Sequence, residues 1–125
     1  MLFDTDMFIW VQRGNLNAKS VIDAATQRYL SLQTYMELLQ GAKNKDQLRL
    51  TRNFLKSLEF EVLPLTENIG HRAAIYIEEY TLSHGIRAGD ALIAATAVEH
   101  QLPLISSNAK HYRAISDLIF VEFSP

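Results

Sequence analysis

Oxygen-bearing side chains stand at four places where an expected strand ends or a helix begins. Asp4 and Asn108 each follow a short apolar run, and Glu37 and Asp90 lie near the starts of expected helices. Three carboxylates about 4 Å apart, at an effective dielectric of about 20, repel by about 4 kcal/mol per pair, so a cluster needs a proton or a cation. Because the chain has no cysteine, the ligands are oxygen atoms, which suit Mg²⁺ or Mn²⁺.

A dication held by carboxylates would support one kind of reaction in particular. It lowers the pKa of a bound water and polarises a phosphoryl oxygen, as phosphodiester hydrolysis requires. We therefore expect a metal-dependent nuclease. Each acid also has a structural explanation: Asp4 or Asp6 can cap a helix, Glu37 can close a capping box with Thr34, and Asp90 can cap its own helix.

The elements that must position these residues alternate between strands and helices. Apolar runs predict strands at Leu2–Phe3, Tyr29–Leu32, Phe60–Leu65, Leu104–Ser106 and Phe120–Phe123. Helices are expected over Met7–Val11, after a cap at Asn17 or Ser20, from Thr34 to Gly41, over Leu48–Leu58, from Thr66 to His84 and over Asp90–His100. This order predicts an α/β fold, a single domain over residues 1–125 with a mainly parallel central sheet flanked by helices.

Parallel topology would bring the four candidates to one edge of the sheet. Asp4 and Asn108 follow strands and therefore lie at the carboxyl edge. Glu37 and Asp90 lie near the starts of helices that run antiparallel to the strands, so they fall at the same edge. Open parallel sheets bind ligands there. The long helix before Asp90 is expected to finish at the opposite edge. Residues 85–89 would then have to return part of the way.

Composition limits the class of protein. With 125 residues, 48% hydrophobic and 21% charged, the chain fits one folded domain and excludes disordered and collagen-like proteins. Apolar runs are too short for a membrane span, so we expect a cytoplasmic protein with no membrane contact. The net charge of -2 provides no general basic field for nucleic acid, so any such contact needs a local patch.

Four motifs follow one another along nearly the whole chain. They are Leu2-Phe3-Asp4-Thr5, Thr34-x-x-Glu37-Leu38-x-x-Gly41, Asp90-Ala91-Leu92-Ile93-Ala94-Ala95-x-Ala97, and Leu104-Ile105-Ser106-Ser107-Asn108 followed by His111-Tyr112. In order and spacing the chain resembles the PIN-domain ribonucleases, and most closely the VapC-type toxins of prokaryotic toxin-antitoxin pairs.

The resemblance implies a set of site residues. Asp4, Glu37 and Asp90 would be the acidic Mg²⁺ ligands, directly or through water, with Mn²⁺ able to substitute. Asn108 would complete the catalytic set, at a position where the family often has aspartate.

Two further residues would support that site. Asp6 stands where the family usually has asparagine or serine, and we hypothesise that it restores the negative charge missing at Asn108. Unchanged Mg²⁺ affinity in both Asp6→Asn and Asn108→Asp would refute this. Ser106 stands where threonine is frequent and would orient a water or a ligand.

The resemblance also implies a substrate and partners. Water activated at the metal would cleave RNA phosphodiester bonds in line, leaving 5′-phosphate and 3′-hydroxyl ends. A small antitoxin would restrain the enzyme by inserting a segment near the early helices and the site, and the toxin would form a homodimer. The best candidates for RNA phosphate contacts are Lys110, His111 and Arg113, because they closely follow Asn108. A second basic stripe consists of Lys45, Arg49, Arg52 and Lys56.

Three alternatives remain open. Asn108 is compatible with a catalytically weakened PIN-like module that only binds RNA or its antitoxin. The Asp4-Thr5-Asp6 triplet resembles the Asp-x-Asp of a phosphatase-like domain, but Ser106-Ser107-Asn108 offers no late acidic pair. A receiver domain needs an aspartate at the end of a middle strand, and Val62-Leu63-Pro64-Leu65 has none.

Overall fold

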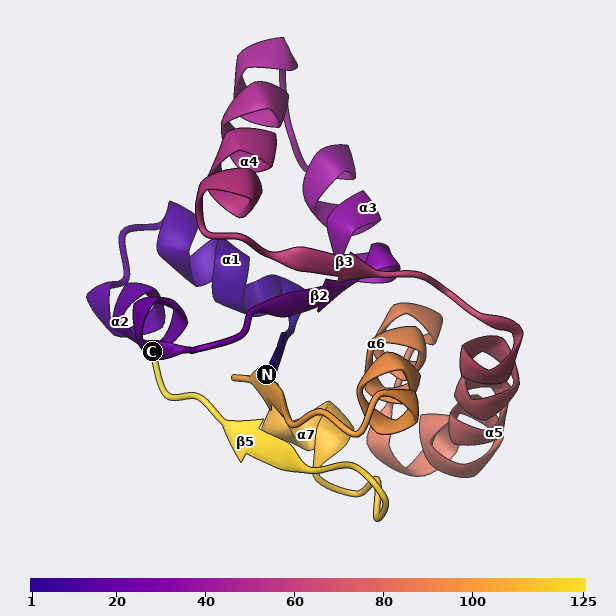
Figure 1. Ribbon diagram of the computed structural model, residues 1–125. Helices are drawn as coiled ribbons and strands as arrows, with labels where there is room; N and C mark the ends of the chain where they lie inside the picture. Colours follow the sequence, from indigo (N-terminus) through magenta and orange to yellow (C-terminus); the bar gives the residue numbers. More distant parts are fainter.

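Five short parallel strands form the centre of the protein, in a computed structural model that describes residues 1–125 (Figure 1). The sheet order is β3-β2-β1-β4-β5, and every pair of neighbouring strands is parallel. The strands are β1 (Leu2–Phe3), β2 (Tyr29–Ser31), β3 (Glu61–Leu63), β4 (Leu104–Ser106) and β5 (Phe120–Glu122). The predicted α/β fold with a parallel central sheet is confirmed.

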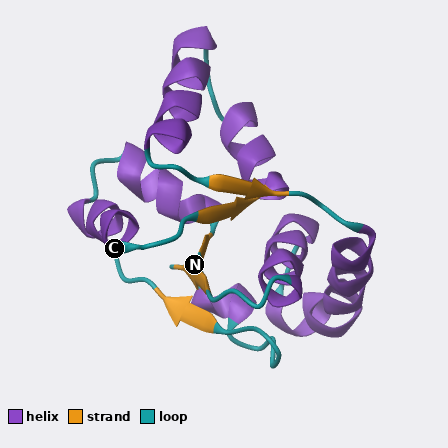
Figure 2. Cartoon of the chain, in the orientation of Figure 1, coloured by secondary structure: helices purple, strands orange, loops and turns teal.

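Helices make all the connections between strands (Figure 2). They are α1 (Thr5–Gln12) and α2 (Leu16–Ala24) before β2, α3 (Leu32–Gln40) and α4 (Lys45–Ser57) before β3, α5 (Glu67–His84) and α6 (Ala88–Glu99) before β4, and the short α7 (Ala109–Tyr112) before β5. None of them combines the length and the apolar composition that crossing a bilayer needs.

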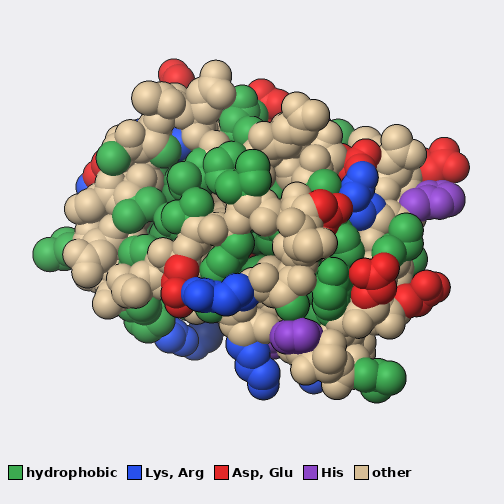
Figure 3. All heavy atoms as spheres, turned by 90° about the horizontal axis from the view of Figure 1, so that it is seen from below, with side chains coloured by type: hydrophobic (Ala, Val, Ile, Leu, Met, Phe, Trp, Pro, Cys, Tyr) green, Lys and Arg blue, Asp and Glu red, His purple; other side chains and the backbone are tan.

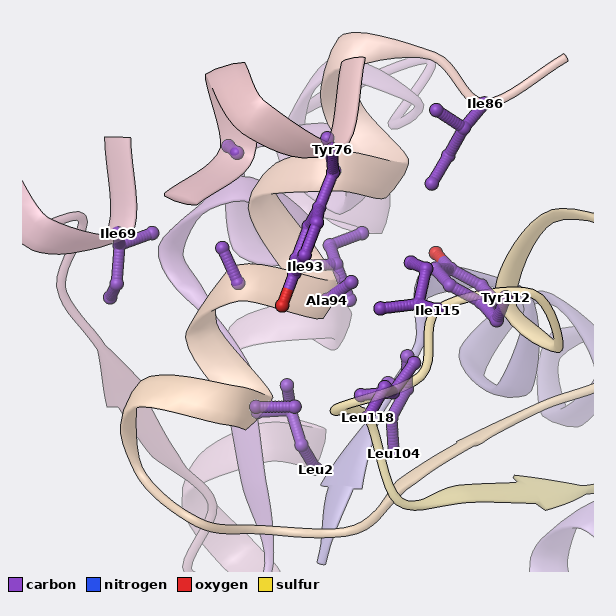
Figure 4. Packing of buried hydrophobic residues seen from close by; sticks show 14 of the residues in the cluster. Leu2, Ile69, Tyr76, Ile86, Ile93, Ala94, Leu104, Tyr112, Ile115 and Leu118 are labelled. Atoms are coloured by element: carbon purple, nitrogen blue, oxygen red, sulfur yellow. The ribbon is translucent and has the colours of Figure 1, made fainter. Parts of the chain in front are cut away.

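Alternation of strand side chains divides the core between the two faces of the sheet. Leu2 and Leu104 point into a cluster covered by α5, α6 and α7, part of which is drawn in Figure 4. Their neighbours Phe3 and Ile105 point into a second cluster covered by α1 to α4. Since both faces are buried at the centre of the sheet, β1 and β4 read as continuous buried runs, whereas the edge strands β3 and β5 carry exposed glutamates.

The order of the strands places a topological switch point between β1 and β4. The chain proceeds from β1 to β2 and β3, then returns to the other side of β1 to form β4 and β5. The connections leaving β1 and β4 therefore diverge, and the carboxyl ends of these two strands form a topological switch point, where open sheets bind ligands. Asp4 follows β1 and Ser107 follows β4 at this point.

The start of α3 differs from the expectation. The helix begins at Leu32, and the Ser31 hydroxyl accepts a hydrogen bond from the Thr34 backbone N–H at 2.9 Å. The expected capping box between Thr34 and Glu37 is therefore wrong, because Ser31 is the capping residue. Glu37 lies beyond the first turn, where its side chain is available for contacts with other elements.

The direction of α5 was also predicted wrongly. Gly85 ends α5 with a left-handed φ of 68°, and Arg87 already caps α6. Three linking residues span at most about 10 Å, whereas an 18-residue helix is about 27 Å long. The carboxyl end of α5 must therefore lie beside the start of α6, so the chain does not need to return across the sheet before Asp90.

Candidate functional site

Asp4 is the most buried acid of the protein, with 5% of its surface exposed. Its Oδ1 accepts from the Thr5 N–H at 2.8 Å, as the cap of α1, and its Oδ2 accepts from the Ser106 hydroxyl at 2.7 Å. Burial raises the pKa of Asp4 to about 7, and the charges of Asp6 and Asp90 act in the same direction. Asp4 therefore favours a proton or a cation at neutral pH.

Asp6 joins the first turn of α1 to the end of β4. Its Oδ2 accepts from the Ser107 N–H at 2.9 Å and from the Ser107 hydroxyl, with a longer contact of 3.3 Å from the Ser106 hydroxyl. The other oxygen, Oδ1, is buried without a hydrogen-bond partner. Asp6 thus fixes the turn that carries Asn108, and it retains one buried oxygen with no donor.

Glu37 reaches the site from α3. The Thr5 hydroxyl lies 3.3 Å from Glu37 Oε1 and 3.0 Å from the Thr34 hydroxyl, and Gln33 Nε2 donates to Glu37 Oε2 at 3.4 Å. Burial raises the pKa of Glu37, and the charge of Asp90 adds to the effect. The close packing of α6 is visible at Gly89, where a Cβ would stand 3.6 Å from Glu37 Oε2.

Asp90 combines the expected capping role with a place in the site. As part of a capping box, its Oδ2 accepts from the Arg87 N–H at 3.2 Å. His111 Nδ1 lies 2.9 Å from the same oxygen, and the Tyr112 hydroxyl donates to Oδ1 at 3.4 Å. This contact is a hydrogen bond to the carboxylate in the tautomer that places the proton on His111 Nδ1.

Asp4, Glu37 and Asp90 are electrostatically coupled. The charge of Asp90 raises the pKa of both other acids, and none of the three forms an ion pair with lysine or arginine. The side chains do not form a closed group of three ligands around one point. Mg²⁺ keeps several waters and is usually held by one or two carboxylates, so an oxygen-only, partly open set of this kind fits a hydrated ion.

The residues after Asn108 lie in different environments. His111 faces Asp90, and the Asn108 side-chain amide lies 2.8 Å from its Nδ1. Arg113 is paired with Glu122, whereas Lys110 is exposed and has no ion pair. Of the three candidates for RNA contact, Lys110 is thus the one with a free charge.

Basic side chains do not form one continuous surface on the face seen from below, where they lie among acidic and apolar ones (Figure 3). The stripe on α4 is Lys45, Arg49, Arg52 and Lys56, of which Arg49 pairs with Asp46 at 3.5 Å.

Sequence reasoning missed α7 and with it the contact of Tyr112 with Asp90. A four-residue helix has no hydrophobic period to detect. The one available signal was the position of His111 and Tyr112 three and four residues after Asn108, which is the spacing of one helical turn.

Comparison with known proteins gives matches over nearly the whole chain. A family model described as the PIN domain matches residues 1–117. Ribonuclease VapC10 of Mycobacterium tuberculosis is 33% identical over 122 residues, which cover 94% of this chain and 90% of that protein. Ribonuclease VapC1 of Rickettsia felis is 31% identical over 125 residues, which cover 94% and 92% of the two chains.

Solved structures agree with these matches. The chain is similar to one in a toxin-antitoxin complex from Klebsiella pneumoniae, with a TM-score of 0.80, 31% identity and 98% of each chain covered. A DNA-bound VapBC from Salmonella typhimurium gives a TM-score of 0.81 at 19% identity, over 97% of this chain and 96% of that one, and so supports the fold alone.

Proposed function

The chain belongs to the PIN-domain family, and from this membership and the geometry of its acidic site we propose that it is a metal-dependent endoribonuclease, the toxin of a toxin-antitoxin pair. Two relatives more than 30% identical are named ribonucleases, which supports the activity. The observation that carries the proposal is the position of Asp4, Glu37 and Asp90 at the switch point of the sheet, where Asp4 and Glu37 both feel the charge of Asp90 and none of the three pairs with lysine or arginine.

Asp4, Glu37 and Asp90 would hold Mg²⁺, for which Mn²⁺ would substitute, directly or through water. When bound, the cation supplies an acidified water and a polarised phosphoryl oxygen. The protein contributes donors that fix the three carboxylates beforehand. Ser106 holds Asp4 and Thr5 holds Glu37. Such contacts around metal ligands reduce the reorganisation that metal binding requires.

The substrate would approach the same edge of the sheet. Asn108 brings an uncharged amide beside the acids, and Lys110 follows it with a free ammonium group on the surface. A phosphate held by Lys110 would lie near the acidic site. The ammonium group is free to bind it, because no acid of this segment pairs with Lys110. Cleavage is expected to leave 5′-phosphate and 3′-hydroxyl ends on RNA.

The activity can be tested with protein freed from any bound partner and incubated with structured RNAs in Mg²⁺, Mn²⁺ or chelator. Cleavage should require the metal and disappear in Asp4→Asn and Glu37→Gln, while Asp46→Asn, at an exposed acid on α4, serves as the matched control. A 5′-phosphate-dependent exonuclease should degrade the products. Cleavage that survives both the chelator and the Asp4 substitution would come from another nuclease and count against the proposal.

A second candidate function is a PIN-like module that binds RNA or an antitoxin without cutting. Asn108 favours it, because this residue brings no charge and its amide contacts His111. RNA binding without cleavage in Mn²⁺, combined with cleavage by Asn108→Asp, would establish this alternative.

The hypothesis that Asp6 supplies the negative charge missing at Asn108 can be tested by comparing the Mg²⁺ affinity of two variants. Asp6 Oδ1 is available because it has no donor, whereas Oδ2 is engaged by the turn after β4. If the hypothesis holds, Asp6→Asn lowers Mg²⁺ affinity and Asn108→Asp raises it. Equal affinity in both variants and in the unchanged protein would reject it.

The proposed partners are a cognate antitoxin and a second copy of the chain. The similar Klebsiella pneumoniae chain was solved within a toxin-antitoxin complex, which supports the first. If a neighbouring gene encodes a small protein, its co-expression with this chain should yield a complex in which RNA cleavage is suppressed. Light scattering of the free protein should give the mass of a dimer, and a monomer at all concentrations would reject the homodimer.

A further inference from the structure

The short helix α7 directs two side chains at one carboxylate. His111 Nδ1 lies 2.9 Å from Asp90 Oδ2, and the hydroxyl of Tyr112 donates to Asp90 Oδ1 at 3.4 Å. The Arg87 N–H also donates to Oδ2, at 3.2 Å. Both oxygens of Asp90 are therefore held. Oδ2 is contacted by the Arg87 N–H and by His111, and Oδ1 is contacted by Tyr112.

The hydroxyl of Tyr112 is confined to the acidic site, where it lies beside Asp90 and Asp4. The residue is fully buried, and its ring packs against Phe120 with 5.9 Å between ring centroids. Figure 4 draws it with Ile115 in the cluster that also contains residues of α5 and α6. A buried hydroxyl that loses its partner costs about 1–3 kcal/mol, so the contact with Asp90 ties the apolar core to the acidic site.

The hydroxyl of Tyr112 is the donor in this contact, because an ionised carboxylate can only accept.

We propose that α7 is a positioning element, in which Tyr112 and His111 fix the orientation of the Asp90 carboxylate so that it can hold the metal ion. This rests on the metal site proposed above. A carboxylate held on both oxygens loses little freedom when a cation binds. Removing such outer contacts around metal ligands typically lowers metal affinity or activity about 10- to 100-fold.

The chain offers a matched control in Tyr76. Its hydroxyl also donates to a carboxylate, Asp117 Oδ1, at 2.9 Å, and the residue is also buried. Asp117 pairs with Arg72 and belongs to a separate network that includes none of the acids of the site. Tyr112→Phe and Tyr76→Phe therefore remove the same atom from two similar surroundings, only one of which borders the site.

The test measures Mn²⁺ affinity of the protein without RNA, from the electron paramagnetic resonance signal of free Mn²⁺. Tyr112→Phe should weaken Mn²⁺ binding about tenfold, while Tyr76→Phe leaves it unchanged. In RNA cleavage, Tyr112→Phe should shift the Mn²⁺ dependence by the same factor. Saturating Mn²⁺ should restore kcat, and KM for RNA should stay the same.

His111 provides a second variant that does not disturb the core. With a side chain 23% exposed, His111→Ala should fold and bind Mn²⁺ more weakly, whereas His111→Asn keeps an amide that can donate to Asp90 and should retain most of the affinity. If Tyr112→Phe failed to fold, this pair would decide the question.

Distinct outcomes separate the two proposals. If Mn²⁺ binds the unchanged protein and Asp4→Asn weakens it, but neither Tyr112→Phe nor His111→Ala does, the positioning role of α7 is overturned and the metal site stands. A fall in kcat that excess Mn²⁺ cannot restore would also overturn it. If Mn²⁺ does not bind the unchanged protein, the metal site and the inference built on it both fail.

Discussion

Asp4→Asn should change how the stability of the protein depends on pH. The substitution keeps a side-chain oxygen that can cap α1 and removes only the carboxyl group that titrates. In chelator, the unchanged protein should lose stability relative to Asp4→Asn as the pH rises from about 5 to about 8. The physical cause is the burial of Asp4, which raises its pKa to about 7.

The sign and size follow from the two protonation equilibria. In the unfolded chain Asp4 loses its proton around its ordinary pKa of 3.8, whereas the folded protein keeps it up to about pH 7. Between these values the folded state binds more protons, so the free energy of unfolding falls as pH rises. At about 1.36 kcal/mol per pKa unit, the loss between about pH 5 and about pH 8 is on the order of 2.5 kcal/mol.

Urea denaturation of both proteins across this range is the assay. The difference in unfolding free energy between the unchanged protein and Asp4→Asn should decrease steadily with pH and become constant above about pH 8. Saturating Mn²⁺ should raise the stability of the unchanged protein at the alkaline end, and Asp4→Asn should gain much less. A difference that does not depend on pH would refute the reasoning, because Asp4 would then titrate alike in both states.

Three other variants test the packing around the site. Gly89→Ala should stabilise α6 by up to about 1 kcal/mol in urea denaturation, yet lower Mn²⁺ affinity, because the new Cβ would stand 3.2 Å from Gln33 Nε2, which donates to Glu37. Thr5→Val should weaken Mn²⁺ binding severalfold, because Glu37 loses a donor, and should cost about 1 kcal/mol of stability. Lys110→Ala should raise KM for RNA and reduce its salt dependence, while Mn²⁺ affinity measured without RNA stays the same.

The strands of the sheet could be predicted from the sequence, because each is a short apolar run too brief for a helix. Leu2–Phe3 and Leu104–Ser106 were placed correctly, and strand topology alone then predicted that Asp4 and Asn108 would share an edge. The start of α3 was harder to predict. Ser31 and Thr34 can both cap a helix, and only tertiary packing decides between them.

The direction of α5 depends on a long-range choice that local sequence does not contain. A helix of 18 residues can begin at either edge of the sheet, and the decision rests on packing along the length of α6. The short link through Gly85 and Arg87 was readable in the sequence, but it was interpreted as an extended return instead of the turn of a helical hairpin.

Capping and metal binding are complementary roles for the acids of this site. Asp4 caps α1, and Asp90 is in the first turn of α6, so the positive ends of two helix dipoles lie at the acidic site. Each dipole stabilises a nearby carboxylate by about 0.3–1 kcal/mol, rising to about 2 kcal/mol in partly buried geometries. That is less than the repulsion and desolvation that raise the pKa of Asp4 to about 7. The helix ends thus orient the acids but leave an excess of negative charge at the site, which a divalent cation would neutralise.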